Sequence, residues 1–201
     1  MELTQAIEQR RSIRKFREEP IPGGMIEELL EAARLAPSGS NIQPARFAVV
    51  TSPAMRKKLG TCTPYKFITR APVIFACCAD RASLTTRDRR VGELLETGAF
   101  VDVEMDPMDL QAYTAAQMDA FAAREYLSMN AAIAIEHLVL RAVDLGLGSC
   151  WIGRFDREKA REILELDGDI QIVALLPVGY PDQSPPRRPR IPLEQLVLKT
   201  V

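Results

Sequence analysis

Arginines near both ends of the chain are suited to binding an anion. Arg10, Arg11 and Arg14 lie in one short segment, and Arg188 and Arg190 lie in another. A guanidinium presents a planar fork of N–H donors that matches the oxygens of a phosphate group. The two segments predict one shared phosphate site if the ends of the chain meet, and two solvated basic patches if they do not. The arginines alone do not decide between these interpretations.

A loop between an expected helix and an expected strand carries neutral hydrogen-bonding groups. It reads APSGSNIQPARF, in which Ser38, Asn41 and Gln43 offer donors and acceptors and Gly39 permits close approach of a backbone. Such groups suit the edge of a planar heterocycle better than a charge. An ordinary helix-to-strand connection is the alternative interpretation.

A glycine-rich segment, GLGSCWIGRF, follows the long expected helix that ends near residue 145. It predicts entry into a short strand whose backbone groups could reach a ligand. The segment lacks the GxGxxG spacing of a dinucleotide-binding turn, so its glycines alone are weak support for a ligand site.

Side chains for acid–base or nucleophilic catalysis are scarce. His137 is the only histidine and lies in a helical run, AAIAIEHLVLRAV, which favours a packing or interface role over a Ser-His-Asp or Cys-His site. Cys62, Cys77, Cys78 and Cys150 contain no CxxC pair, and neighbours on a strand point to opposite faces. We therefore expect buried free thiols, no metal site, and chemistry that depends on a bound cofactor.

Composition excludes several classes of protein. The 201 residues contain 26 Lys plus Arg and 27 Asp plus Glu, which gives a formal net charge of −1. A dedicated nucleic-acid binder usually carries a strong basic excess. No apolar run approaches the roughly 20 residues of a membrane span, and the N-terminal segment has no secretory pattern. We expect a cytoplasmic protein with no nucleic-acid or membrane partner.

Hydrophobic periodicity and turn residues predict the elements that hold these segments. Ser52 and Asp156 are expected to cap helices. We find no repeat and no linker, so we expect one domain over 1–201, with 81–124 as a variable lid or helical excursion. Helices are expected at 3–11, 25–36, 53–60, 125–145 and 156–166, and strands at 47–51, 72–79, 149–153 and 170–178.

The helix at 125–145 is apolar on most of its surface. Met129, Ala132, Ile133 and Leu140 recur at helical spacing, together with Glu136 and Val143, and much of the remaining surface is also Ala, Ile or Val. A helix that is apolar on most sides is buried in a core or against a second subunit. The helix therefore favours a dimer.

Four segments in order, RRSIRKF, APSGSNIQPARF, GLGSCWIGRFD and LLPVGYPDQSPPRRPRIPLEQLV, resemble successive motifs of the FMN-dependent nitroreductase family. The resemblance covers essentially the whole chain apart from 81–124. It implies an α+β fold, namely a three-layer α/β/α sandwich with a central mixed, mainly antiparallel sheet. It also implies an intertwined homodimer with FMN at the interface.

The resemblance assigns roles to the motif residues. Arg10 corresponds to the residue that binds the FMN phosphate, with Arg188 and Arg190 completing that site, and Ser12 and Arg14 correspond to residues that reach the ribityl chain and the pyrimidine edge. Arg11 would line the ribityl side, the serine-rich loop would reach the partner's flavin, and the strand end would approach the flavin ring by its backbone. Lys66 is a further candidate whose register in the motif is unclear. The implied FMN-binding residues are Arg10, Arg11, Ser12, Arg14, Pro37, Ser38, Gly39, Asn41, Gln43, Trp151, Ile152, Gly153, Arg154, Arg188 and Arg190.

The activity implied by this resemblance is a ping-pong oxidoreduction. NADH or NADPH would give hydride to flavin N5, and an electron-poor acceptor such as a nitroaromatic, quinone or enone would then take the electrons. The reactive centre would belong to the flavin, so no catalytic side chain is assigned. Two alternatives stay open at this stage. One is a specialised member that removes halogen reductively or fragments flavin; the other is a non-catalytic flavin-binding regulator.

Overall fold

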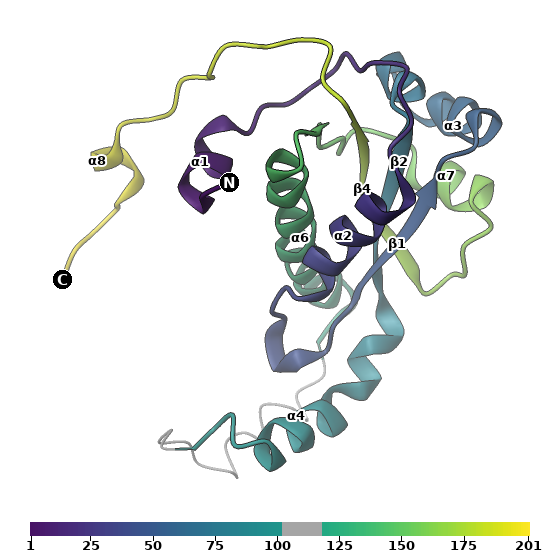
Figure 1. The fold of residues 1–201 in the computed structure, drawn as a ribbon. Coiled ribbons are helices and arrows are strands. Elements are labelled where there is room, and N and C mark those ends of the chain that lie inside the picture. The colour runs from purple at the N-terminus through teal and green to yellow at the C-terminus, as the bar shows by residue number, and fades with distance from the viewer. Residues whose placement is uncertain (102–117) are drawn as a thin grey trace.

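A central antiparallel sheet organises the chain, and a computed structural model describes residues 1–101 and 118–201 (Figure 1). The strand order is β1-β2-β4-β3. The strands are β1 (Ala45–Val50), β2 (Val73–Asp80), β3 (Gly148–Ser149) and β4 (Ile170–Gly179). The helices are α1 (Leu3–Gln9), α2 (Gly23–Arg34), α3 (Pro53–Leu59), α4 (Arg87–Glu96), α6 (Ala120–Asp144), α7 (Arg157–Ile163) and α8 (Leu193–Leu196). Short 3-10 turns are η1 (Gly39–Asn41), η2 (Gly60–Cys62), η3 (Lys66–Arg70) and η4 (Arg81–Thr86).

Alternating side chains of β2 build the two sides of the core. Phe75 and Cys77 pack with residues of α2 and α6, whereas Ile74 and Cys78 pack with residues of α3 and α7. This alternation follows from the two-residue period of a strand. It confirms the α+β, three-layer arrangement and the expectation that adjacent Cys77 and Cys78 face opposite ways. All four cysteines are buried and free.

A parallel contact comes from the segment that follows α1. The three strand pairs of the sheet are antiparallel, and Ser12 adds an isolated parallel bridge to Ser149. Phe16 then pairs with Pro181 in an antiparallel bridge, and the side chains of Lys15 and Asp182 form an ion pair at 2.7 Å. The segment 12–16 therefore lies along the edge of the sheet formed by β3 and the end of β4.

The strand expected at 149–153 is shorter and begins earlier than predicted. It pairs with β4 at Gly148 and Ser149, and Ile152 makes a separate bridge to Leu175. Between them, the N–H of Cys150 donates to the carbonyl of Pro177 at 3.3 Å. A proline has no N–H to donate in return, so regular pairing is interrupted at this point.

The buried face of α6 is not the face marked by Met129 and Leu140. Leu127, Ala131, Ile135, Leu138 and Ala142 are the residues that pack into the chain's own core. Met129 is 55% exposed, and Ala132, Ile133, Glu136, Leu140 and Val143 are only half-buried. His137 is exposed. The described chain thus covers this apolar face of α6 only in part.

The region after β2 is helical where it is described. η4 and α4 extend away from the sheet toward η1, and residues 102–117 of the predicted lid lie outside the described residues (Figure 1). Whether 81–124 acts as a lid stays a prediction.

The C-terminal tail extends away from the sheet after β4 (Figure 1). Every residue from 187 to 201 is exposed, including Leu193 at 70% and Leu198 at 99%. Among the described residues, no helix is both long and apolar enough to cross a lipid bilayer.

Candidate functional site

The N-terminal arginine segment and the glycine-rich segment are held together by their backbones. The N–H of Ile13 donates to the carbonyl of Ser149 at 2.8 Å. A Cβ atom at Gly148 would lie 2.5 Å from the Ile13 side chain, so only glycine permits this approach. The structure thus brings two of the sequence-predicted segments, 10–14 and 148–152, to one place.

Glu136 of α6 joins these two segments, and sequence reasoning did not single it out as a site residue. Its carboxylate lies 3.8 Å from Nε of Arg10 and accepts a hydrogen bond from Nε1 of Trp151 at 3.2 Å. A carboxylate within an otherwise apolar helix is the sequence signal that could have identified it.

The surroundings of Cys150 show how closely the arginine segment approaches. Burial raises the pKa of the Cys150 thiol, while the positive charge of Arg14, a hydrogen bond with Ser12 and the charge of Arg10 act in the opposite direction. Three predicted site residues therefore gather around one buried side chain. Cys150 itself stays protonated and takes the role of a packing residue, as expected.

The backbone N–H groups of the glycine-rich segment alternate in direction. The N–H groups of Cys150 and Ile152 donate to carbonyls of β4. Because successive groups of an extended backbone alternate in direction, the N–H groups of Trp151 and Gly153 face the opposite way. We therefore expect these two N–H groups on the edge that the segment after α1 approaches through Ser12 and Ile13.

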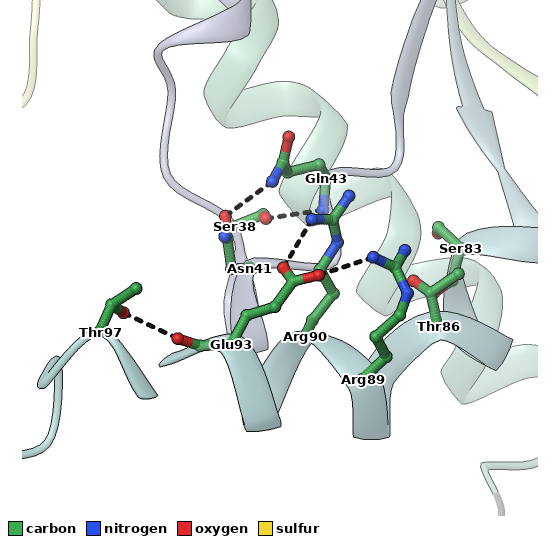
Figure 2. Close-up of polar contacts among 9 residues, drawn as sticks. All are labelled: Ser38, Asn41, Gln43, Ser83, Thr86, Arg89, Arg90, Glu93 and Thr97. Carbon is green, nitrogen blue, oxygen red and sulfur yellow. Dashed lines mark hydrogen bonds and ion pairs between the residues drawn. The ribbon is translucent and has the colours of Figure 1, made fainter. Parts of the chain in front are cut away.

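The Ser38–Gln43 loop adopts an unusual backbone conformation. Ser40, Asn41 and Gln43 have positive φ angles of 49°, 51° and 48°, a region that favours glycine and tolerates asparagine. The backbone N–H of Gln43 donates to Oγ of Ser38 at 2.9 Å, and Nε2 of Gln43 donates to Oδ1 of Asn41 at 3.1 Å (Figure 2). The side chains of Ser38, Asn41 and Gln43 thus lie close together, and each takes part in a hydrogen bond within the loop.

This loop lies at a different point along α6 from the arginine segment. The N–H of Gly39 donates to Oδ1 of Asn130 at 2.7 Å. Asn130 precedes Glu136 by six positions, which is about 9 Å along a helix. A cavity of about 340 Å³ beside the loop is lined by Pro37, Ser38, Gln43 and Asn130, among other residues. Within one chain, the loop and the arginine segment form two separate parts.

The C-terminal arginines do not join the N-terminal ones within the described chain. Nη1 of Arg190 donates to the carbonyls of Arg188 and Pro189, and no hydrogen bond or ion pair of the described residues links Arg188 or Arg190 to Arg10. Both side chains extend from the exposed tail. A phosphate site shared by both ends of the chain stays a prediction that needs another arrangement of the tail.

Other predicted residues have local roles. Nη1 of Arg11 donates to the carbonyls of Glu8 and Arg10, and the Arg154 side chain is exposed. The ammonium of Lys66 donates to the carbonyls of Gly60 and Thr63 at 3.0 and 3.3 Å, so its charge is committed to the backbone of its own loop.

Comparisons with known proteins agree with this arrangement. The model of the nitroreductase family matches residues 7–180. A Thermus thermophilus protein named NADH dehydrogenase is 35% identical over 192 residues, which cover 94% of this chain and 91% of that protein.

Solved structures with the same fold include flavin-binding proteins. A protein of Exiguobacterium sibiricum solved in complex with FMN has a TM-score of 0.84 at 21% identity, over 100% of this chain and 98% of that one. The NADPH:FMN oxidoreductase of Vibrio harveyi, solved with NAD+, has a TM-score of 0.77 at 21% identity, over 99% of this chain and 77% of that one. Since the family model spans most of the chain and a relative is more than 30% identical over nearly all of it, the chain belongs to the nitroreductase family.

Proposed function

We propose that this chain is an FMN-dependent oxidoreductase that takes hydride from NADH or NADPH and passes the electrons to a small electron-poor acceptor. A nitroaromatic, a quinone or an enone would suit this role, in a ping-pong cycle. The observation that carries the proposal is the gathering of Arg10, Ser12 and Arg14 beside the glycine-rich segment in a chain of this family. FMN, when bound, would supply the hydride-accepting atom N5.

The residues present fit the chemical groups of FMN. Arg10 offers a guanidinium fork for the phosphate, and its ion pair with Glu136 is long, at 3.8 Å, and only partly buried. The N–H groups of Trp151 and Gly153 face away from the sheet and can donate to a ring edge. Arg14 places a positive charge near the same segment, which stabilises negative charge that develops on a ligand. No carboxylate, histidine or thiol is needed for the proton chemistry in this scheme.

A homodimer with FMN at the interface is part of the same proposal. The partly covered apolar face of α6 and the exposed apolar tail are surfaces that a second copy can bury. The Ser38–Gln43 loop and the arginine segment contact α6 at different positions, and the family resemblance implies that each site combines the loop of one copy with the arginine segment of the other. We also propose that the chain forms one catalytic domain. Its four free, buried cysteines support a reducing compartment such as the cytoplasm.

Flavin content and its reduction test this proposal. The purified protein is expected to be yellow or to bind added FMN, and to lose its visible absorbance when NADH or NADPH is added without oxygen. Addition of a quinone or a nitroaromatic should then restore the absorbance. A colourless protein that does not take up FMN would contradict the cofactor assignment. Bound FMN that neither nicotinamide reduces would indicate a non-catalytic flavin-binding protein instead.

A further inference from the structure

We propose that Asn130 is a positioning residue that sets the Ser38–Gln43 loop in the conformation needed to contact the flavin. The inference rests on the proposed function and assigns a role to a residue that no sequence motif includes. Asn130 lies within α6 and is only 2% exposed. Its Oδ1 accepts the backbone N–H of Gly39 at 2.7 Å, and its Nδ2 donates to the carbonyl of Tyr126 at 2.8 Å.

A buried asparagine in the middle of a helix has a cost that its contacts must offset. Asparagine is a poorer helix former than alanine or leucine, and a buried amide without hydrogen-bond partners loses the favourable free energy of its hydration. The neighbours Leu127, Ala131 and Ala134 show that this part of α6 otherwise buries apolar groups. The contact that an apolar residue could not supply is the acceptor for the Gly39 N–H.

The loop needs such a restraint because its backbone is strained. Positive φ angles at Ser40, Asn41 and Gln43 place non-glycine residues in the left-handed region, which disfavours this loop conformation. The hydrogen bonds from Gln43 to Ser38 and Asn41 connect the loop to itself and do not fix its position on the molecule (Figure 2). The bond from Gly39 to Asn130 connects the loop to α6.

Steric contacts make the placement specific. A Cβ atom at Gly39 would lie 2.2 Å from the hydroxyl oxygen of Tyr126, so any larger residue here requires the Tyr126 side chain to move. On its other side the loop faces α4, where Glu93 accepts hydrogen bonds from Arg90 and Arg89 (Figure 2). The loop is thus enclosed by two helices, and Asn130 supplies the directional bond.

One helix therefore holds both separate parts of the proposed site. Asn130 binds the loop, and Glu136 contacts Arg10 and Trp151 about 9 Å further along α6. Because a helix is rigid over this distance, the spacing of these two polar residues sets where α6 holds the loop that it offers to one site and the arginine segment that it offers to the other. The same helix presents the apolar face that a second copy would cover.

Two variants of Asn130 and one matched control test this role. Asn130→Ala removes the acceptor for Gly39, whereas Asn130→Asp keeps an oxygen that can accept the same N–H but loses the Nδ2 donor to the carbonyl of Tyr126. Ser128→Ala is the control, because Oγ of Ser128 accepts a hydrogen bond from Nε2 of Gln171 at 2.7 Å on the same helix, without contacting the loop. Amide hydrogen exchange of residues 38–43 reports on the loop directly, and FMN affinity and the melting temperature are measured in parallel.

We expect Asn130→Ala to speed exchange in the loop about tenfold, and to raise the Kd for FMN by a similar factor, which matches the loss of roughly 1.4 kcal/mol. Asn130→Asp should restore slow exchange only in part, because it keeps the acceptor for Gly39 and loses the donor to Tyr126, and Ser128→Ala should lower the melting temperature without changing exchange or affinity. If Asn130→Ala does not fold, Asn130→Ser, whose shorter side chain leaves the Gly39 N–H without this acceptor, is measured in the same way.

Two results would overturn the inference. One is an Asn130→Ala variant whose loop exchanges no faster than that of Ser128→Ala. The other is an Asn130→Ala variant whose loop exchanges faster but whose Kd for FMN equals that of the wild type. A wild-type protein that does not bind FMN would refute the proposed function, while the exchange measurement would still decide whether Asn130 holds the loop.

Discussion

Glu136 contacts both Arg10 and Trp151, and the length of its ion pair with Arg10 determines how readily the Arg10 guanidinium can bind a ligand. The Arg10–Glu136 distance of 3.8 Å and the partial exposure of both side chains make this ion pair worth less than about 1 kcal/mol. A phosphate dianion with bidentate geometry is a stronger partner for a guanidinium than one distant carboxylate. Arg10 is therefore prepared for a ligand: Glu136 orients it without neutralising it strongly.

Arg10→Ala should weaken FMN binding far more than it affects folding. Loss of a charge-assisted hydrogen bond, worth about 1.5–3 kcal/mol, corresponds to a rise in Kd of roughly 10- to 100-fold. FMN fluorescence titration measures this. Arg161→Ala is a suitable control, because Arg161 pairs with Glu158 on α7 at 2.8 Å and lies outside the proposed site. Equal FMN affinity in the two variants would show that the phosphate binds elsewhere.

The cysteines of β2 predict how stability changes at alkaline pH. Burial raises the pKa of Cys78 to about 12 from an ordinary value of 9.0. Between these values the unfolded state loses the proton and the folded state keeps it, so the free energy of unfolding falls as pH rises. The full slope for one such thiol is about 1.4 kcal/mol per pH unit. Cys77, whose pKa is raised as well by burial, adds to the effect.

Urea unfolding of the reduced protein between pH 8 and pH 10.5 measures this slope. Cys78→Ala should be less stable than the wild type at pH 8 and should lose stability more slowly above pH 9. Lysines and tyrosines titrate in the same range, so the difference between the two proteins is the informative quantity. Parallel pH curves for both proteins would show that Cys78 ionises equally in the folded and unfolded states.

At the scale of single elements, two expected helix caps differ in the structure. Asp156 and Ser52 both precede helices and both are good N-cap residues by type. Oδ1 of Asp156 accepts the N–H of Lys159 at 3.0 Å, whereas the side chain of Ser52 makes no capping hydrogen bond to α3. Pro53 at the start of α3 already sets the backbone there.

Asp156→Ala should therefore lower the free energy of unfolding by about 1 kcal/mol, and Ser52→Ala by much less. Chemical denaturation of both variants at one pH measures the difference. Comparable losses from the two substitutions would mean that residue type alone, rather than the hydrogen bond, determines the cap energy in this protein.

The type of an element was predictable from the sequence where local signals are strong. The limits of a strand and the buried face of a helix were not, because tertiary contacts determine them. The continuous apolar run of β2 and the periodic helix α6 are both present. The limits of β3 were not predictable, because they depend on Pro177, 27 residues after Cys150. The carbonyl of Pro177 can accept a hydrogen bond, but its nitrogen cannot donate one. The buried face of α6 could not be identified either, since most of its faces are apolar.

At the scale of the molecule, sequence reasoning identified the segments of the site but not how they are held. The arginine segment and the glycine-rich segment meet as their motifs suggest. Sequence reasoning missed Asn130 and Glu136 because their contacts join distant parts of the chain. Asn130 binds Gly39, 91 residues earlier, and Glu136 contacts both Arg10 and Trp151. The placement of Arg188 and Arg190 depends on what the tail contacts, and a single chain does not supply that contact.

Apolar side chains of the C-terminal tail are a surface to which we expect a second copy of the chain to bind. Ile191, Leu193, Leu196, Val197 and Leu198 are between 53% and 99% exposed, which is an unfavourable arrangement for a lone chain in water. Burying an apolar side chain of this size contributes about 1.5–3 kcal/mol. If the tail packs on a second copy, two leucines account for more than a hundredfold in the dimer dissociation constant.

The double substitution Leu193→Asp plus Leu196→Asp should therefore shift the protein from dimer to monomer at micromolar concentration, as measured by sedimentation. The mass of one chain is 22.4 kDa, so the two states separate clearly. Lys199→Ala on the same tail is the control and should leave the dimer intact. The double variant keeps Arg188 and Arg190, so any accompanying loss of FMN would follow from lost assembly and not from lost arginines. A wild-type protein that sediments as a monomer, or a double variant with an unchanged dissociation constant, would show that these leucines do not hold a second copy.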